Sequence, residues 1–203
     1  MKNIKTYNTE HFYKTKKIKR IVFGILAVSI VLAVIVFTRM YKAIMYPNTT
    51  TTNQDAVSLY IFSDDDFDIV KERLYSDSII VNKKSFEWLA KKLDYPEYIK
   101  SGHYVITNGM NNNQLLNKLR SGSQTPIDFT FNNIRTIEQF AKEVDEQLEM
   151  DSTSFLEALN NNAEVKQMGF DKDNIASLFI PNTYELYWNI DADEFIDKMA
   201  KEY

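Results

Sequence analysis

The stretch Leu178–Asn189 holds the residue types best suited to carbohydrate chemistry. It contains four aromatic side chains, Pro181, two asparagines and Glu185. Aromatic rings stack on the flat apolar faces of sugars, amides bond to hydroxyls, and a carboxyl group can donate a proton. The alternative is a buried aromatic turn in which Asn182 and Thr183 satisfy backbone groups. The residues alone favour this alternative.

Other chemistries are limited by the supply of residues. The two histidines, His11 and His103, are far apart in the sequence, which argues against a histidine metal site or a Ser-His-Asp triad. The absence of cysteine excludes a disulfide scaffold, a cysteine zinc site and a thiol nucleophile. The acidic run Asp64–Asp68 suggests a calcium loop, but Ile69 and Tyr75 stand where an EF-hand loop needs Gly and Glu. Helix capping is the better interpretation of this run. We therefore expect no metal site.

Charge is segregated along the 203 residues, although the formal net charge is only −4. Residues 1–20 hold seven Lys or Arg and one Glu, whereas residues 47–203 hold 15 basic and 27 acidic residues. Nucleic-acid binding needs a basic surface, so the acidic part argues against it.

An apolar run over residues 21–38 separates these two regions. It carries no charge, and as a helix it would extend roughly 27 Å, close to the ~30 Å hydrocarbon core of a bilayer. The competing interpretation is a cleaved signal peptide, but Arg39–Lys42 fits a cleavage site poorly. The basic residues before the run place the N-terminus in the cytoplasm. We expect a single-pass anchor in the cell (inner) membrane, with the rest periplasmic or otherwise extracytoplasmic.

The residue patterns predict an α+β protein with five regions. These are a cytoplasmic basic tail (1–20), a transmembrane helix (21–38), a linker (39–56), a β-α-α-β unit (57–107) and the start of a mixed α/β domain (108–203). Within the unit, strands over 57–62 and 103–107 enclose a helix capped by Asp64–Asp66 and a helix over 85–93.

The last region begins with a helix over 111–119, closed by Gly122, and a strand over 126–131. It continues as helices that begin at Thr136, Asp151 and Asp191. We expect the last helix to run to Tyr203 and to have an apolar face without a partner, formed by Phe195, Ile196 and Met199.

Several segments, in order, resemble the YceG-like family of endolytic murein transglycosylases. Its Pro-Asp-Thr-Tyr element is similar to Pro181-Asn182-Thr183-Tyr184, and PNTYELYW resembles Bacteroidetes-type variants. Upstream, the segments similar to the family pattern are Ser101–Ile106, Gly109–Met110, Leu115–Gly122 and 124–135. The resemblance covers roughly 58–203. It implies that 57–107 is a LysM-like subdomain and that one N-terminal anchor precedes it.

The resemblance implies lytic cleavage of the β-1,4 bond between N-acetylmuramic acid and N-acetylglucosamine in nascent peptidoglycan strands, leaving 1,6-anhydro ends. It implies no cofactor, and it suggests cell-wall synthases as partners. Ala176-Ser177 stands where many members have Glu-Gly. The family's catalytic glutamate lies in an Ala-Ser-x-x-Glu-Lys-Glu segment, which we expect beyond residue 203.

Asn182, Tyr184 and Glu185 are therefore predicted to contact substrate in the cleft or to support it, and not to catalyse. We expect the 203 residues to be the N-terminal part of a longer protein and inactive alone. The alternative is a non-catalytic, membrane-anchored protein that binds peptidoglycan or acts as a scaffold.

Overall fold

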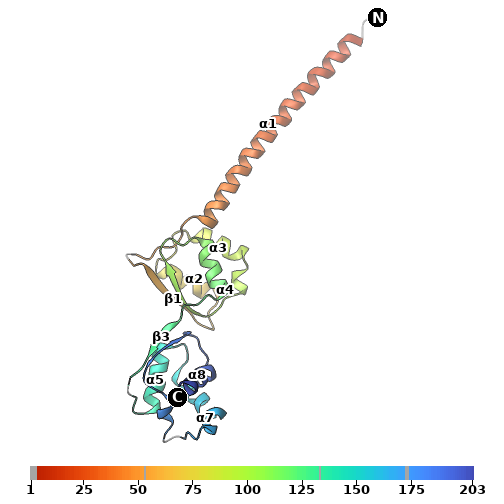
Figure 1. The fold of residues 1–203 in the computed structure, drawn as a ribbon. Coiled ribbons are helices and arrows are strands. Elements are labelled where there is room, and N and C mark those ends of the chain that lie inside the picture. Colours follow the sequence, from red (N-terminus) through yellow and green to blue (C-terminus); the bar gives the residue numbers. More distant parts are fainter. Residues whose placement is uncertain (1–3, 53, 133, 172–173) are drawn as a thin grey trace. The chain divides into compact units, whose positions relative to one another are not determined.

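The computed structural model describes residues 4–52, 54–132, 134–171 and 174–203. It divides into two units at Tyr46. The first unit contains α1 (Ile4–Met45), a single unbroken helix (Figure 1). Within the described residues, Lys19–Met45 is the one helical segment long and apolar enough to span a membrane. Its large apolar side chains are exposed, as those of a lipid-facing helix are. The predicted span of 21–38 lies inside a longer helix.

The second unit begins with a lobe, residues 47–126, that follows the predicted β-α-α-β order. Its strands pair antiparallel, with Ala56 opposite Thr107 and Ile61 opposite Gly102. Asp66 begins the first helix of the lobe by accepting a hydrogen bond from the Ile69 amide, so capping accounts for this member of the acidic run. The elements are β1 (Ala56–Ile61), α2 (Phe67–Ser76), α3 (Lys83–Lys92), η1 (Tyr95–Glu97), β2 (Gly102–Thr107) and α4 (Asn112–Ser121).

The polar residues that follow α1 are packed into this first lobe. Asn48, Thr49 and Thr51 are each only 4% exposed. The Asn48 side chain donates to Asn112 Oδ1 at 2.6 Å and accepts from the Asn82 amide at 2.7 Å. These residues belong to the segment predicted as a linker (39–56). In the structure they are buried, because their amide and hydroxyl groups bond to partners that are distant in the sequence.

The second lobe, residues 127–203, has its own core. Strands β3 and β4 pair antiparallel, and helices pack around a cluster of aromatic side chains that includes Phe129, Phe140, Phe155 and Phe195, all fully buried. The elements are β3 (Ile127–Thr130), α5 (Ile137–Gln147), α6 (Ser152–Asn161), α7 (Ala163–Gln167), η2 (Ile175–Leu178), β4 (Thr183–Leu186) and α8 (Ala192–Glu202). Each lobe thus contributes one two-stranded sheet.

The last helix corrects one expectation. The predicted apolar face of α8 does have a partner, since Phe195 and Ile196 are fully buried and Met199 is 1% exposed. The Phe195 ring meets the Phe129 ring edge-on, with 5.4 Å between centroids. The expectation of an unpartnered face was wrong because its partners lie on β3, α5 and α6, which are more than 30 residues earlier.

Candidate functional site

The predicted site residues lie on or beside a two-stranded ribbon, β3 and β4. The register places Phe129 opposite Tyr184 and Asp128 opposite Glu185. Side chains alternate between the faces of a strand, so Tyr184 points into the core while Glu185 points outward. The structure therefore places these two predicted residues on opposite faces.

The outward side of the ribbon is a polar surface. We call it the ribbon face, and it consists of Asp128, Thr130, Thr183 and Glu185, all exposed. The two threonine hydroxyls lie 2.8 Å apart and share a hydrogen bond. The two carboxylates stand directly opposite each other, an arrangement of like charges that costs stability. Carboxylate and hydroxyl oxygens in one row can accept and donate hydrogen bonds to sugar hydroxyls.

Two long side chains bond to the backbone of the ribbon. Gln147 Nε2 donates to the Thr130 carbonyl at 2.9 Å, and its Oε1 accepts from the Thr130 amide at 3.1 Å. These bonds occupy the backbone groups through which another strand would pair with β3. Lys198 Nζ donates to the Glu185 carbonyl at 2.7 Å. Side chains from α5 and α8 thus fix the backbone of both strands of the ribbon.

Tyr184 is part of the packing that supports this face. It is 6% exposed, its ring stacks on that of Phe131 with 5.8 Å between centroids, and its hydroxyl donates to the Ile180 carbonyl at 2.7 Å. Burial, and secondarily the charge of Glu202, raises the pKa of its phenol. Tyr184 therefore fixes the strand, and its ring is not presented to solvent.

Asn182 is exposed at the start of β4. Its side-chain oxygen accepts from the Thr183 amide at 2.8 Å, and its carbonyl accepts from the Phe131 amide at 3.4 Å. The local backbone bonding matches the predicted turn chemistry of this segment. Asn182 directly precedes Thr183 of the ribbon face in the chain.

The aromatic end of the same stretch joins the two lobes. Trp188 is only 7% exposed, yet it packs away from the aromatic core of its own lobe. Its ring meets the Tyr60 ring at 5.0 Å and the Phe62 ring at 4.8 Å, edge-on in both cases. Tyr60 also stacks on His103 at 4.7 Å. We call Tyr60, Phe62, His103 and Trp188 the junction cluster.

Hydrogen bonds reinforce the junction cluster. Asn189 Nδ2 donates to the Ser101 hydroxyl at 2.9 Å, and the Ser63 amide donates to the Glu149 carboxylate. The Glu149 amide in turn donates to the Trp188 carbonyl at 3.0 Å. These bonds place the ribbon of the second lobe at a fixed position against the sheet of the first.

His103 is a structural member of this junction. It is 6% exposed, and its ring nitrogens lie 2.9 Å from the Thr125 carbonyl and 2.9 Å from the Ser58 hydroxyl. A carbonyl only accepts, so Nδ1 carries the proton towards Thr125. Both nitrogens are thus engaged in holding β1, β2 and the approach to β3.

The residues before His103 show why this segment has its sequence. Gly102 has φ +137°, and a Cβ there would lie 2.2 Å from the side chain of Gln124. Only glycine suits that backbone and that approach. Two residues on, Tyr104 is fully buried and donates to the Lys100 carbonyl at 2.9 Å. The Gly-His-Tyr order is therefore a packing requirement of β2.

No group of three or more potential ligands among His, Asp and Glu gathers to hold a metal in the described part of the chain. Sequence reasoning missed the junction cluster because Trp188 meets partners more than 120 residues away. The alternation of strand 57–62 puts Tyr60 and Phe62 on the same face as Ser58, and this was the available signal.

A known family model matches most of the chain. The model of the YceG-like family matches residues 59–203. No curated protein matches. Among solved structures, a YceG-like protein from Listeria monocytogenes is similar, with 17% sequence identity and a TM-score of 0.44. The match covers 74% of this chain and 54% of that protein, so the chain spans about half the length of this relative.

Proposed function

The chain belongs to the YceG-like family, and on that premise we propose that it is a membrane-anchored endolytic peptidoglycan transglycosylase. The single observation that carries the proposal is the match of the family model over residues 59–203. The apolar segment Lys19–Met45 supports an anchor just before the matched region. In this proposal residues 21–38 cross the inner membrane and the N-terminus is cytoplasmic.

The proposed reaction cleaves the β-1,4 bond between N-acetylmuramic acid and N-acetylglucosamine. The bond between C1 of the muramoyl sugar and O4 of the next sugar breaks, and a bond from O6 to the same C1 forms. A carboxyl group protonates the leaving O4 and then removes the proton of the 6-hydroxyl. Water is not consumed, so the product ends in a 1,6-anhydro sugar. This contrasts with hydrolases that use two carboxylates and water.

Within this reaction, the described residues are assigned to binding and positioning. The ribbon face can bond sugar hydroxyls through Glu185 and Thr183, with Asn182 beside it, while Tyr184 supports the strand from behind. The junction cluster keeps this surface fixed against the LysM-like subdomain, 57–107. A fixed surface can hold a glycan strand in one register without further ordering of the protein.

The test uses the gene product as the cell makes it, purified in detergent and incubated with uncrosslinked glycan strands. Mass spectrometry is expected to find new 1,6-anhydro ends. New reducing ends made by water, or no new ends, would refute the lytic reaction. The variant Glu185→Gln is expected to raise KM with little change in kcat, because it removes a binding group. Glu157→Gln, an exposed change on α6, is its matched control.

A second candidate function is a non-catalytic protein that binds peptidoglycan or serves as a scaffold for cell-wall synthases. It is favoured by the exposed hydroxyl and carboxylate groups of the ribbon face, which can bind sugar hydroxyls without cleaving a bond. Sedimentation with purified peptidoglycan separates the two. Binding without any new glycan ends supports the second function, and new anhydro ends exclude it.

A further inference from the structure

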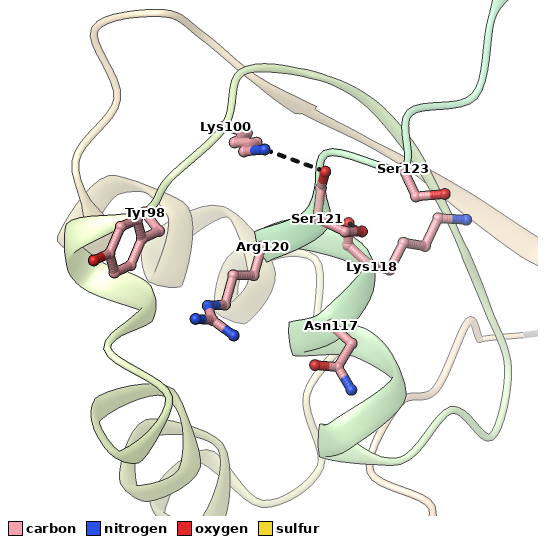
Figure 2. A pocket seen from close by; sticks show the side chains of 7 residues that line it. All are labelled: Tyr98, Lys100, Asn117, Lys118, Arg120, Ser121 and Ser123. Carbon is pink, nitrogen blue, oxygen red and sulfur yellow. Dashed lines mark hydrogen bonds between the residues drawn. The ribbon is translucent and has the colours of Figure 1, made fainter.

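An open pocket in the first lobe gathers positive charge at the end of α4. Its volume is about 770 Å³, and it is lined by three cationic side chains together with hydroxyl, amide and aromatic groups (Figure 2). The cations are Lys100, Lys118 and Arg120. We call these three residues and Tyr98 the basic pocket.

The charge of the basic pocket is unusual for this part of the chain. Residues 127–203 hold six basic and 17 acidic residues, and residues 47–126 hold nine basic and ten acidic residues. Nevertheless, no carboxylate lines the pocket. Within the described residues, the ion pairs involve Lys71, Arg73 and Lys142 and none of the pocket cations. Three cations are therefore gathered without protein anions to balance them.

Contacts within the protein explain the positions of only some of these three cations. Lys118 Nζ donates to the Val105 carbonyl at 2.7 Å. Lys100 Nζ donates to the Ser121 carbonyl at 3.3 Å, at the C-terminal end of α4 (Figure 2). Cations are favourable at such an end. The guanidinium of Arg120 has no hydrogen-bond or ion-pair partner in the described part of the chain. Its guanidinium lies over the Tyr98 ring, 5.6 Å from the centroid.

The geometry of Arg120 favours carboxylate binding. A guanidinium presents parallel N–H groups that match the two oxygens of a carboxylate, and stacking on a ring limits its orientations. Tight phosphate sites typically use the amides of a helix N-terminus, and this pocket has none of these because it lies at the C-terminal end of α4. Long side chains spread over an open pocket suit several carboxylates on a flexible chain better than one compact phosphate.

We propose that the basic pocket binds the carboxylates of the peptide stems that muramoyl sugars carry, so that this protein prefers peptide-bearing strands to denuded ones. This inference deepens the proposed function by naming the substrate class. The hydroxyl of Ser123 and the amide of Asn117 line the same pocket and can bond to peptide groups. The preference should weaken with salt, because exposed charges are screened within about 10 Å at 0.1 M.

The test measures binding of the full chain in detergent to three soluble forms of the same glycan strands. These are peptide-bearing strands, strands with their stem carboxylates chemically amidated, and strands freed of peptides by an amidase. We expect peptide-bearing strands to bind about tenfold more tightly than both other forms. Arg120→Gln and Lys100→Gln should each remove most of this difference.

Lys92→Gln is the matched control, because it makes the same charge change at an exposed position of α3 outside the pocket. Circular dichroism verifies that the variants are folded. Equal binding of all three strand forms would overturn the inference, as would an Arg120→Gln variant that keeps the preference. Polyphosphate that binds with the same dependence on Arg120 and displaces the strands would overturn the carboxylate assignment. The assay measures binding and not cleavage. Its result therefore does not depend on whether the proposed cleavage reaction is observed.

Discussion

Replacing Trp188 by alanine should weaken the attachment between the two lobes. The ring is 7% exposed and meets Tyr60 and Phe62 edge-on. Truncating a buried Trp costs about 3–5 kcal/mol, and each aromatic pair contributes about 0.5–1.5 kcal/mol of interaction. Because the ring lies at a junction where the lobes can adjust, we expect the low end, about 3 kcal/mol. Tyr187→Ala removes an aromatic ring that is 54% exposed and should cost about 0.5 kcal/mol or less.

Urea unfolding of the full chain in detergent, followed by circular dichroism, measures this difference. With a slope of about 2 kcal/mol per molar urea, Trp188→Ala should lower the midpoint by about 1.5 M relative to the wild type. The variant retains Trp88 on α3 as its single Trp, so fluorescence reports the first lobe separately. Equal midpoints for Trp188→Ala and Tyr187→Ala would show that the junction cluster does not hold the lobes together.

Three further changes test the first lobe. Gly102→Ala should lower the free energy of unfolding by about 2 kcal/mol or more, because of backbone strain and the clash with Gln124. Adding Gln124→Ala should remove the clash but not the strain, so urea titrations of the double variant should show a partial recovery. Asn48→Ala should lower the free energy of unfolding by about 1–3 kcal/mol, because the buried side-chain oxygen of Asn112 loses the hydrogen bond from Asn48. Thermal melts would detect this loss. Burial raises the pKa of Tyr104 from 10.0 to about 12, so stability is full below pH 10 and falls as the pH rises towards 12. Alkaline unfolding curves of Tyr104→Phe should fall less steeply, and identical curves would contradict the assigned burial effect.

Most of the longer helices were predictable from the sequence because their signals are local, whereas the short helices α7, η1 and η2 were not predicted. Asp66, Thr136, Asp151 and Asp191 each accept a hydrogen bond from an amide two or three residues on, as capping residues do. Gly122 ends α4 in the left-handed conformation with φ 71°. Such contacts are contained within a few residues, so the residue types alone indicate them.

The site was less predictable because its contacts are distant. The residue types of the aromatic stretch around Tyr184 suggested either a sugar-binding surface or a buried turn. In the structure, Tyr184 belongs to a strand that packs on the core, whereas Trp188 packs at the junction between the lobes. Pro181 and Asn182 obscured the short strand β4, whose alternation would have put Tyr184 inside and Glu185 outside. The basic pocket was hidden in the same way, since Lys100 and Arg120 come from separate segments.

The bond between Asn48 and Asn112 has a consequence for how the protein folds as it is made. The two residues are 64 positions apart, and ribosomes add about 5–20 residues per second. Asn48 is therefore added to the chain about 3–13 s before Asn112. During that delay the bond to Asn112 cannot form, and the amide and hydroxyl groups of residues 48–51 keep the segment hydrated. Apolar residues at these positions would leave buried partners without a bond in the finished lobe, and would also expose the nascent chain to aggregation.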